Sequence, residues 1–170
     1  MSVYKLAEQL TVAIDLLVSH YPQGLSVLLG QVEPPTSQDI AELVASFSVG
    51  DDLGVRVDGG ESVPEAERMI CTAEKYFDVI ERAGGWEHVI AVVRDWSVHY
   101  STTWAIIVDH VCWVQGGFSR VDESQLDRIA RKHHTTVETI CRKKREFPSV
   151  LARAILRTPK HGDKWNLKAV

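Results

Sequence analysis

The stretch from Asp122 to Leu156 constrains the fold of this chain more than any other, because two helix start signals lie in it about three turns apart. Asp122 or Ser124 can accept hydrogen bonds from the free N–H groups of a helix that we expect from about Gln125 to His133. Apolar residues recur within that helix at helical spacing. The stretch therefore predicts a short amphipathic helix that is followed at once by another.

The second helix start follows the segment 133–136, in which Thr135 or Thr136 can cap the next helix. Proline lacks the backbone N–H group that continues a helix. We therefore expect Pro148 to end the second helix and to begin a third, from Ser149 to Leu156.

Two apolar residues of this stretch, Ala130 and Ile140, stand ten residues apart, one in each of the first two helices. In a helix-turn-helix, a small residue on the first helix permits a close crossing, and a branched residue on the second helix fills the angle between them. The segment resembles the helix-turn-helix superfamily in this pattern, in which Ile129-Ala130 is followed by Thr136-Val137 and Ile140.

The resemblance implies that the second helix lies in the major groove of DNA, with its N-terminal residues near the base edges. It covers about 30 of the 170 residues. It departs from the usual pattern at His134, where glycine is common, and at Thr135, where an apolar residue is common. Carried onto this chain, the resemblance predicts nine DNA-binding residues: Thr135, Thr136, Glu138 and Thr139 near the bases, Arg142, Lys143 and Arg145 near the backbone, and also Arg131 and Lys132.

Charge is distributed unevenly along the chain. Residues 1–98 hold 6 Lys/Arg against 16 Asp/Glu, whereas residues 99–170 hold 13 against 7. From Leu126 to Lys160 ten basic residues stand against three acidic ones, a net charge of +7. A basic run is often only a solvated helix face, but this one coincides with two correctly spaced helix starts. We therefore expect the C-terminal part to bind double-stranded DNA, and the acidic part to bind itself, RNA polymerase or another transcription protein.

The remainder of the chain also predicts helices, since apolar residues recur at three- and four-residue steps. The expected helices are 3–21, 64–83 and 86–100, a helix over 37–48 that Thr36 or Ser37 caps, and a helix that Ser101 or Thr102 caps and Gly116-Gly117 closes. The stretch after Gly24 is too short and too uniformly apolar for spacing to decide its type, and we favour a short helix there. The glycine- and aspartate-rich segment 49–63 is either a linker or a local hairpin, and we favour the linker.

The expected fold is all-α, a multi-helix bundle with a C-terminal helix-turn-helix module. Its expected parts are an acidic N-terminal helical unit (1–48), the linker or loop (49–63), a Trp-rich core or dimerisation region (64–117), the helix-turn-helix module (118–157) and a flexible tail (158–170).

Four of the five tryptophans, Trp86, Trp96, Trp104 and Trp113, fall between residues 86 and 115. Aromatic faces can stack on unpaired nucleic-acid bases. These tryptophans, however, stand among Val and Ile at helical spacing, which is typical of a buried core or of an interface between two copies. We favour a core or a homodimer interface over base stacking.

Patterns for an enzyme or a metal site are weak. His88, His99 and His110 recur at intervals of eleven residues, but an expected helix break near Ser101 separates their faces. The sequence contains no recognisable nucleophile motif and no Gly-rich phosphate loop after a strand. We expect neither enzyme activity nor a bound metal or cofactor.

The three cysteines, Cys71, Cys112 and Cys141, are odd in number and lack CxxC spacing, which favours a reducing compartment. No apolar run reaches the roughly 18 residues that a membrane span requires, and the N-terminus lacks the pattern of a signal peptide. We expect a cytoplasmic protein without a membrane partner.

Together these features predict a sequence-specific DNA-binding transcription regulator. Its layout, with the basic motif near the C-terminus after acidic helices, is similar to that of sigma-like or phage antiterminator-like regulators. Two alternatives stay open: a small DNA-recognition subunit of a packaging or recombination complex, and a helical protein-interaction adaptor whose basic face binds an acidic protein.

Overall fold

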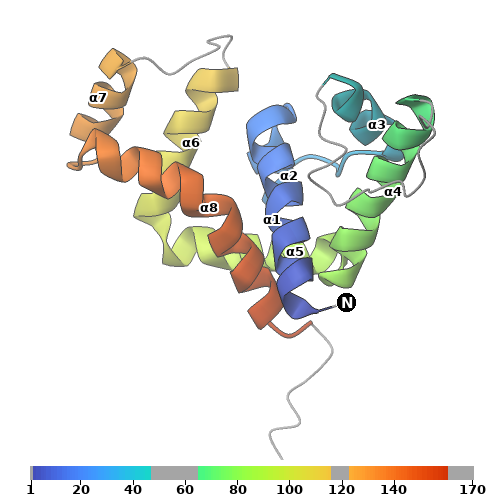
Figure 1. The fold of residues 1–170 in the computed structure, drawn as a ribbon. Coiled ribbons are helices and arrows are strands. Elements are labelled where there is room, and N and C mark those ends of the chain that lie inside the picture. The colour runs from blue at the N-terminus through green and yellow to red at the C-terminus, as the bar shows by residue number, and fades with distance from the viewer. Residues whose placement is uncertain (1, 47–64, 116–122, 161–170) are drawn as a thin grey trace, which may run out of the picture.

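The computed structural model describes residues 2–46, 65–115 and 123–160, and the regular structure within these ranges is entirely helical (Figure 1). The helices are α1 (Val3–His20), α2 (Gly24–Leu28), α3 (Ser37–Ser46), α4 (Glu65–Arg82), α5 (Gly85–His99), α6 (Ser101–Gln115), α7 (Glu123–Lys132) and α8 (Val137–Arg157). The all-α prediction is confirmed for this part of the chain. The expected linker or hairpin at 49–63 and most of the expected tail lie outside the described residues.

One large hydrophobic core joins all of these helices except α7. Helix α1 supplies fully buried side chains at Leu10, Ile14 and Leu17, at the helical spacing of its amphipathic pattern, and it packs against both α8 and α4. The expected parts 1–48, 64–117 and 118–157 therefore share one core, while their boundaries stay a prediction. No helix among the described residues is long and apolar enough to cross a membrane.

Local signals fix the helix ends in the N-terminal part. The Asp39 N–H group donates to Thr36 Oγ1 at 3.2 Å and the Thr36 N–H group donates to Asp39 Oδ2 at 2.8 Å, a reciprocal cap at the start of α3. Hydrogen bonding to Thr36 lowers the pKa of the Asp39 carboxyl. Gly24 opens the expected short helix, α2, and a Cβ there would lie 1.8 Å from the Leu17 carbonyl oxygen. Only glycine allows the chain to return this closely onto α1.

The Trp-rich helices α5 and α6 meet α8 through aromatic rings. The Trp96 ring is buried, with its centroid 6.3 Å from that of Trp104 and 5.6 Å from that of Phe147, both in edge-on geometry. Aromatic pairs favour this arrangement. Trp86 also packs against the core. Trp96 therefore lies in the core, whereas Trp86 and Trp104 are partly buried and pack against it, and the choice between a core and a homodimer interface for these two stays a prediction. The side chain of Trp113 lies outside the described residues.

Helix α8 corrects the prediction that Pro148 ends one helix and begins another. A single helix runs from Val137 to Arg157 with Pro148 inside it. An interior proline costs roughly 3 kcal/mol, but Phe147 and Leu151, on either side of it, are fully buried. Both halves of α8 therefore gain enough burial to stay helical, and the helix changes direction partway along its length, as Figure 1 shows.

Candidate nucleic-acid interface

A tight turn, residues 133–136, joins α7 to α8. The Thr135 N–H group donates to the Ala130 carbonyl at 2.9 Å, and the His134 N–H group donates to the Arg131 carbonyl at 3.3 Å. His134 has a φ of 51°, in the left-handed region that favours glycine. Histidine tolerates this conformation better than branched residues do. The chain therefore turns sharply here although it lacks the glycine that is common at this position.

Helix α8 begins with a local threonine pair. Thr136, one of the two expected caps, has extended backbone geometry, and its Oγ1 accepts a hydrogen bond from the Thr139 N–H group at 3.2 Å. The two hydroxyl oxygens lie 2.9 Å apart and share a second hydrogen bond. Glu138 is exposed in the first turn. The exposed start of α8 therefore presents a carboxylate and a hydroxyl pair of fixed geometry.

A second, smaller core lies under the turn. Its buried members are Ile106 of α6, Ile129 and Ala130 of α7 and Ile140 of α8. Ala130 and Ile140 thus share one cluster, as their ten-residue spacing predicts. Because Ile106 belongs to this cluster, α7 and the start of α8 pack on α6, and Figure 1 shows these three helices together at one side of the molecule.

Asp109 of α6 holds the turn in place. Its Oδ2 accepts a hydrogen bond of 2.6 Å from His133 Nε2 and lies 2.9 Å from Lys132 Nζ. Burial raises the pKa of the Asp109 carboxyl, but the hydrogen bonds from His133 and Lys132 outweigh this effect, and the pKa is lowered. Sequence reasoning missed this role, although a lone carboxylate in an apolar helix was a signal that it needed a partner.

Six of the nine predicted DNA-binding residues are exposed: Arg131, Lys132, Thr136, Glu138, Arg142 and Arg145. Thr135 and Thr139 are partly buried at the turn. Lys143 is also partly buried, and its Nζ donates to Thr103 Oγ1 of α6 at 2.9 Å. The structure therefore leaves six of the nine exposed, with Arg145 at the groove between α1 and α8, and it directs Lys143 toward α6.

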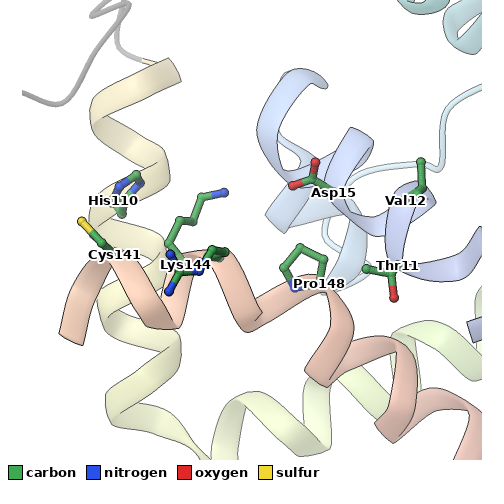
Figure 2. Close-up of a pocket in the computed structure, with 8 residues that line it drawn as sticks. Thr11, Val12, Asp15, His110, Cys141, Lys144 and Pro148 are labelled. Carbon is green, nitrogen blue, oxygen red and sulfur yellow. The ribbon is translucent and has the colours of Figure 1, made fainter. Parts of the chain in front are cut away.

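Lys144, one of the ten basic residues in the predicted basic segment, is directed toward α1. Its Nζ donates to Ser19 Oγ at 3.2 Å, and Ser19 donates to Asp15 at 3.0 Å. Figure 2 shows Lys144 and Asp15 on opposite sides of a groove of about 560 Å³ between α1 and α8. Burial lowers the pKa of the Lys144 ammonium, which the charge of Asp15 partly offsets. The basic charge that faces solvent is therefore smaller than the sequence count.

The arginines behave differently from the lysines. Within the described residues Arg128, Arg131, Arg142 and Arg145 are exposed and make no hydrogen bond or ion pair through their side chains. Arg142 and Arg145 follow Glu138 at steps of four and three residues, so all three lie on one face of α8. This face points away from the buried residue Ile140. The free positive charge near the turn is therefore carried by guanidinium groups.

The three histidines at eleven-residue intervals do not form a cluster. His88 is buried, and its Nε2 lies 3.0 Å from the Ile155 carbonyl oxygen. His99 ends α5, and His110 lies on α6 beyond the break at Tyr100. Across ranges 2–46, 65–115 and 123–160, no group of three or more His, Cys, Asp or Glu side chains is placed to hold a metal ion.

No protein-family model, curated protein or solved structure matches this chain.

Proposed function

We propose that the chain is a sequence-specific DNA-binding regulator in which α7, the turn and the first half of α8 form a helix-turn-helix module. One observation carries the proposal: an exposed helix start lies next to a set of arginines without intramolecular partners. Helices that read the major groove place N-terminal residues at the base edges and basic residues at the phosphates. Glu138 would read base edges, and Arg142 and Arg145 would contact the backbone.

The arginine pattern supports this proposal more strongly than the net charge does. Arginine matches phosphate oxygens with two parallel N–H groups. An arginine already paired with a carboxylate would have to break that pair on binding, whereas Arg142 and Arg145 keep all their donors available. The anchoring of the turn by Asp109 supports a rigid placement of the two helices, which base recognition requires.

In the same proposal the acidic helices contact a second copy of the chain, RNA polymerase or another transcription protein. Helices α3 and α4 lie at the far side of the molecule from α7 (Figure 1). A partner that binds there would leave the α7–α8 surface free. This arrangement suits a regulator that connects DNA to the transcription machinery.

Fluorescence anisotropy with a labelled random-sequence duplex of about 30 base pairs tests the DNA-binding part. The logarithm of the affinity should fall with the logarithm of salt concentration, and Arg142→Ala or Arg145→Ala should each reduce the magnitude of this slope by about 0.9. Lys5→Ala, an exposed basic residue on α1, is the matched control and should leave the slope unchanged. Absence of salt-sensitive binding by the unaltered chain would refute the proposal and favour the adaptor alternative.

Selection from a random duplex pool tests the sequence-specific part. The unaltered chain should enrich a short consensus, and Glu138→Ala should relax one or two positions of it, because each specific base contact discriminates by about 1–3 kcal/mol. A pool that stays random after selection would mean that the chain binds DNA without reading it.

A further inference from the structure

A second groove lies at the other end of α8 from the turn. It is bounded by the C-terminal half of α5 and the C-terminal half of α8, and it has a volume of about 490 Å³. Small-ligand sites typically have volumes of about 300–1,000 Å³. The residues of α8 that line the groove begin at Val150, 14 residues after Thr136, so at about 1.5 Å per residue the groove begins roughly 20 Å along the helix from the turn. It is therefore separate from the proposed DNA-reading surface.

One wall of the groove is an aromatic pair. The Trp96 ring is buried, and the Tyr100 ring stacks on it with centroids 5.0 Å apart and planes inclined by 32°. His99 meets the Tyr100 ring edge-on at 5.9 Å. Tyr100 nevertheless remains 52% exposed. The groove thus contains a partly exposed tyrosine ring that is held in position by its neighbours before any ligand arrives.

The opposite wall carries two guanidinium groups. Arg153 and Arg157 lie one turn apart on α8 and both line the groove. Arg153 Nε donates to the Ser149 carbonyl at 3.3 Å, and Arg157 has no side-chain partner among the described residues. Asp95 also lines the groove, yet in the described part of the chain no ion pair joins it to either arginine. Two positive groups and one carboxylate leave the groove with a net positive charge.

This combination points to a particular ligand chemistry. A tyrosine face held in place stacks with a flat heteroaromatic ring, two arginines bind a phosphate through paired N–H groups, and a free carboxylate accepts hydrogen bonds from an amino group. A simple carboxylic acid or an inorganic anion would occupy the arginines but leave the Tyr100 ring uncovered. A ligand with a base and a phosphate uses all three features.

We infer that this groove binds a nucleotide, with its base stacked on Tyr100 and its phosphate held by Arg153 and Arg157. Asp95 accepts a hydrogen bond from the base. The nucleotide is either a free mononucleotide or an unpaired residue of a nucleic-acid strand, which share this chemistry. The inference does not depend on the proposed duplex-binding function, because none of these residues belongs to the predicted DNA-binding set.

The test uses the full chain and two probes. A labelled 12-residue oligodeoxyadenylate, whose bases carry the amino group that Asp95 would accept from, is titrated by fluorescence anisotropy. AMP is titrated by the quenching of tryptophan fluorescence, since Trp96 lies against Tyr100. Tyr100→Ala should weaken binding of the active probe by roughly tenfold, as expected for the loss of one stacked base, and Tyr100→Phe should retain it. The double variant Arg153→Ala, Arg157→Ala should weaken it further. Tyr4→Ala, on α1 and 84% exposed, is the matched control and should change nothing.

Each outcome decides a point. AMP binding that is sensitive to Tyr100→Ala assigns a free nucleotide as the ligand, whereas strand binding that is sensitive to Tyr100→Ala and resists competition by AMP assigns an unpaired residue. Binding of neither probe, or equal binding by the unaltered chain and a folded Tyr100→Ala variant, overturns the inference. Arg142→Ala should weaken duplex binding and leave AMP binding within twofold, so failure of this inference and failure of the duplex-binding proposal are distinguishable.

Discussion

Replacement of Asp109 tests whether the turn between α7 and α8 is anchored by a single carboxylate. Asp109→Ala removes a hydrogen bond of 2.6 Å to His133 Nε2, whose side chain is only 10% exposed, and an ion pair of 2.9 Å to Lys132. A hydrogen bond to a charged group typically contributes about 1.5–3 kcal/mol. The Lys132 pair is 64% exposed on the lysine side and contributes little, at most about 1 kcal/mol. We expect the free energy of unfolding to fall by about 2 kcal/mol at pH 7.

The effect should depend on pH in a defined direction. Because the pKa of Asp109 is lowered in the folded protein, its stabilising contribution is fully present above the unfolded-state pKa of about 3.9. That contribution is lost as the pH falls through the lower, folded-state pKa. The difference in the free energy of unfolding between the unaltered chain and Asp109→Ala should therefore have its full value at pH 7 and should become smaller below about pH 3.9.

Urea denaturation followed by circular dichroism at pH 7 and at pH 2.5 measures both effects. Asp109→Asn should lower the free energy of unfolding by roughly half as much as Asp109→Ala does. The asparagine side-chain oxygen can still accept a hydrogen bond from His133 but carries no charge. Asp127→Ala, an exposed carboxylate on α7, is the control and should change stability by less than about 0.5 kcal/mol. If Asp109→Ala loses no more than Asp127→Ala, or loses the same amount at both pH values, the anchoring role is refuted.

Two further predictions concern stability and use the same urea measurement at pH 7. His134→Gly should raise the free energy of unfolding by up to about 1 kcal/mol, because glycine adopts the left-handed conformation of this residue (φ 51°) without strain; a loss of stability would show that the histidine side chain contributes more than its backbone strain costs. Phe147→Ala should lower the free energy of unfolding by about 3–5 kcal/mol, because the ring is fully buried against Trp96 and Trp104. A loss of stability below about 1 kcal/mol would contradict the aromatic packing at this junction.

Features that depend on neighbouring residues could be predicted from the sequence. Helical spacing predicted α1, α3, α4, α5, α6 and α7, and the capping chemistry of threonine gave Thr135 or Thr136 as the cap of α8, of which Thr136 is the cap observed. The spacing between Ala130 and Ile140 predicted their shared cluster. These signals are local, because a helix repeats every three to four residues and a cap reaches only three residues ahead.

Features that depend on contacts between distant residues could not be predicted in this way. Lys143 bonds to Thr103, 40 residues away, and Lys144 bonds to Ser19, 125 residues away. The net charge of +7 counted from the sequence therefore included both lysines, although neither ammonium group is free of partners within the protein. Pro148 was misread for the same reason: the rule that proline ends a helix is local, whereas the burial of Phe147 and Leu151 that overrides it comes from packing against other helices.

Helix α8 connects the two sets of residues to which we assign binding. Near its start it packs through Ile140 on the small cluster under the turn, and from Phe147 onward it packs through Phe147, Leu151 and Ile155 in the main core. The change of direction within α8 therefore sets where Arg142 and Arg145 lie relative to α1 and α5. Helix packing is stepwise rather than continuously adjustable, because cores are close-packed. A displacement of either end of α8 would therefore have to disrupt the cluster in which that end is packed, that of Ile140 under the turn or that of Leu151 and Ile155 in the main core.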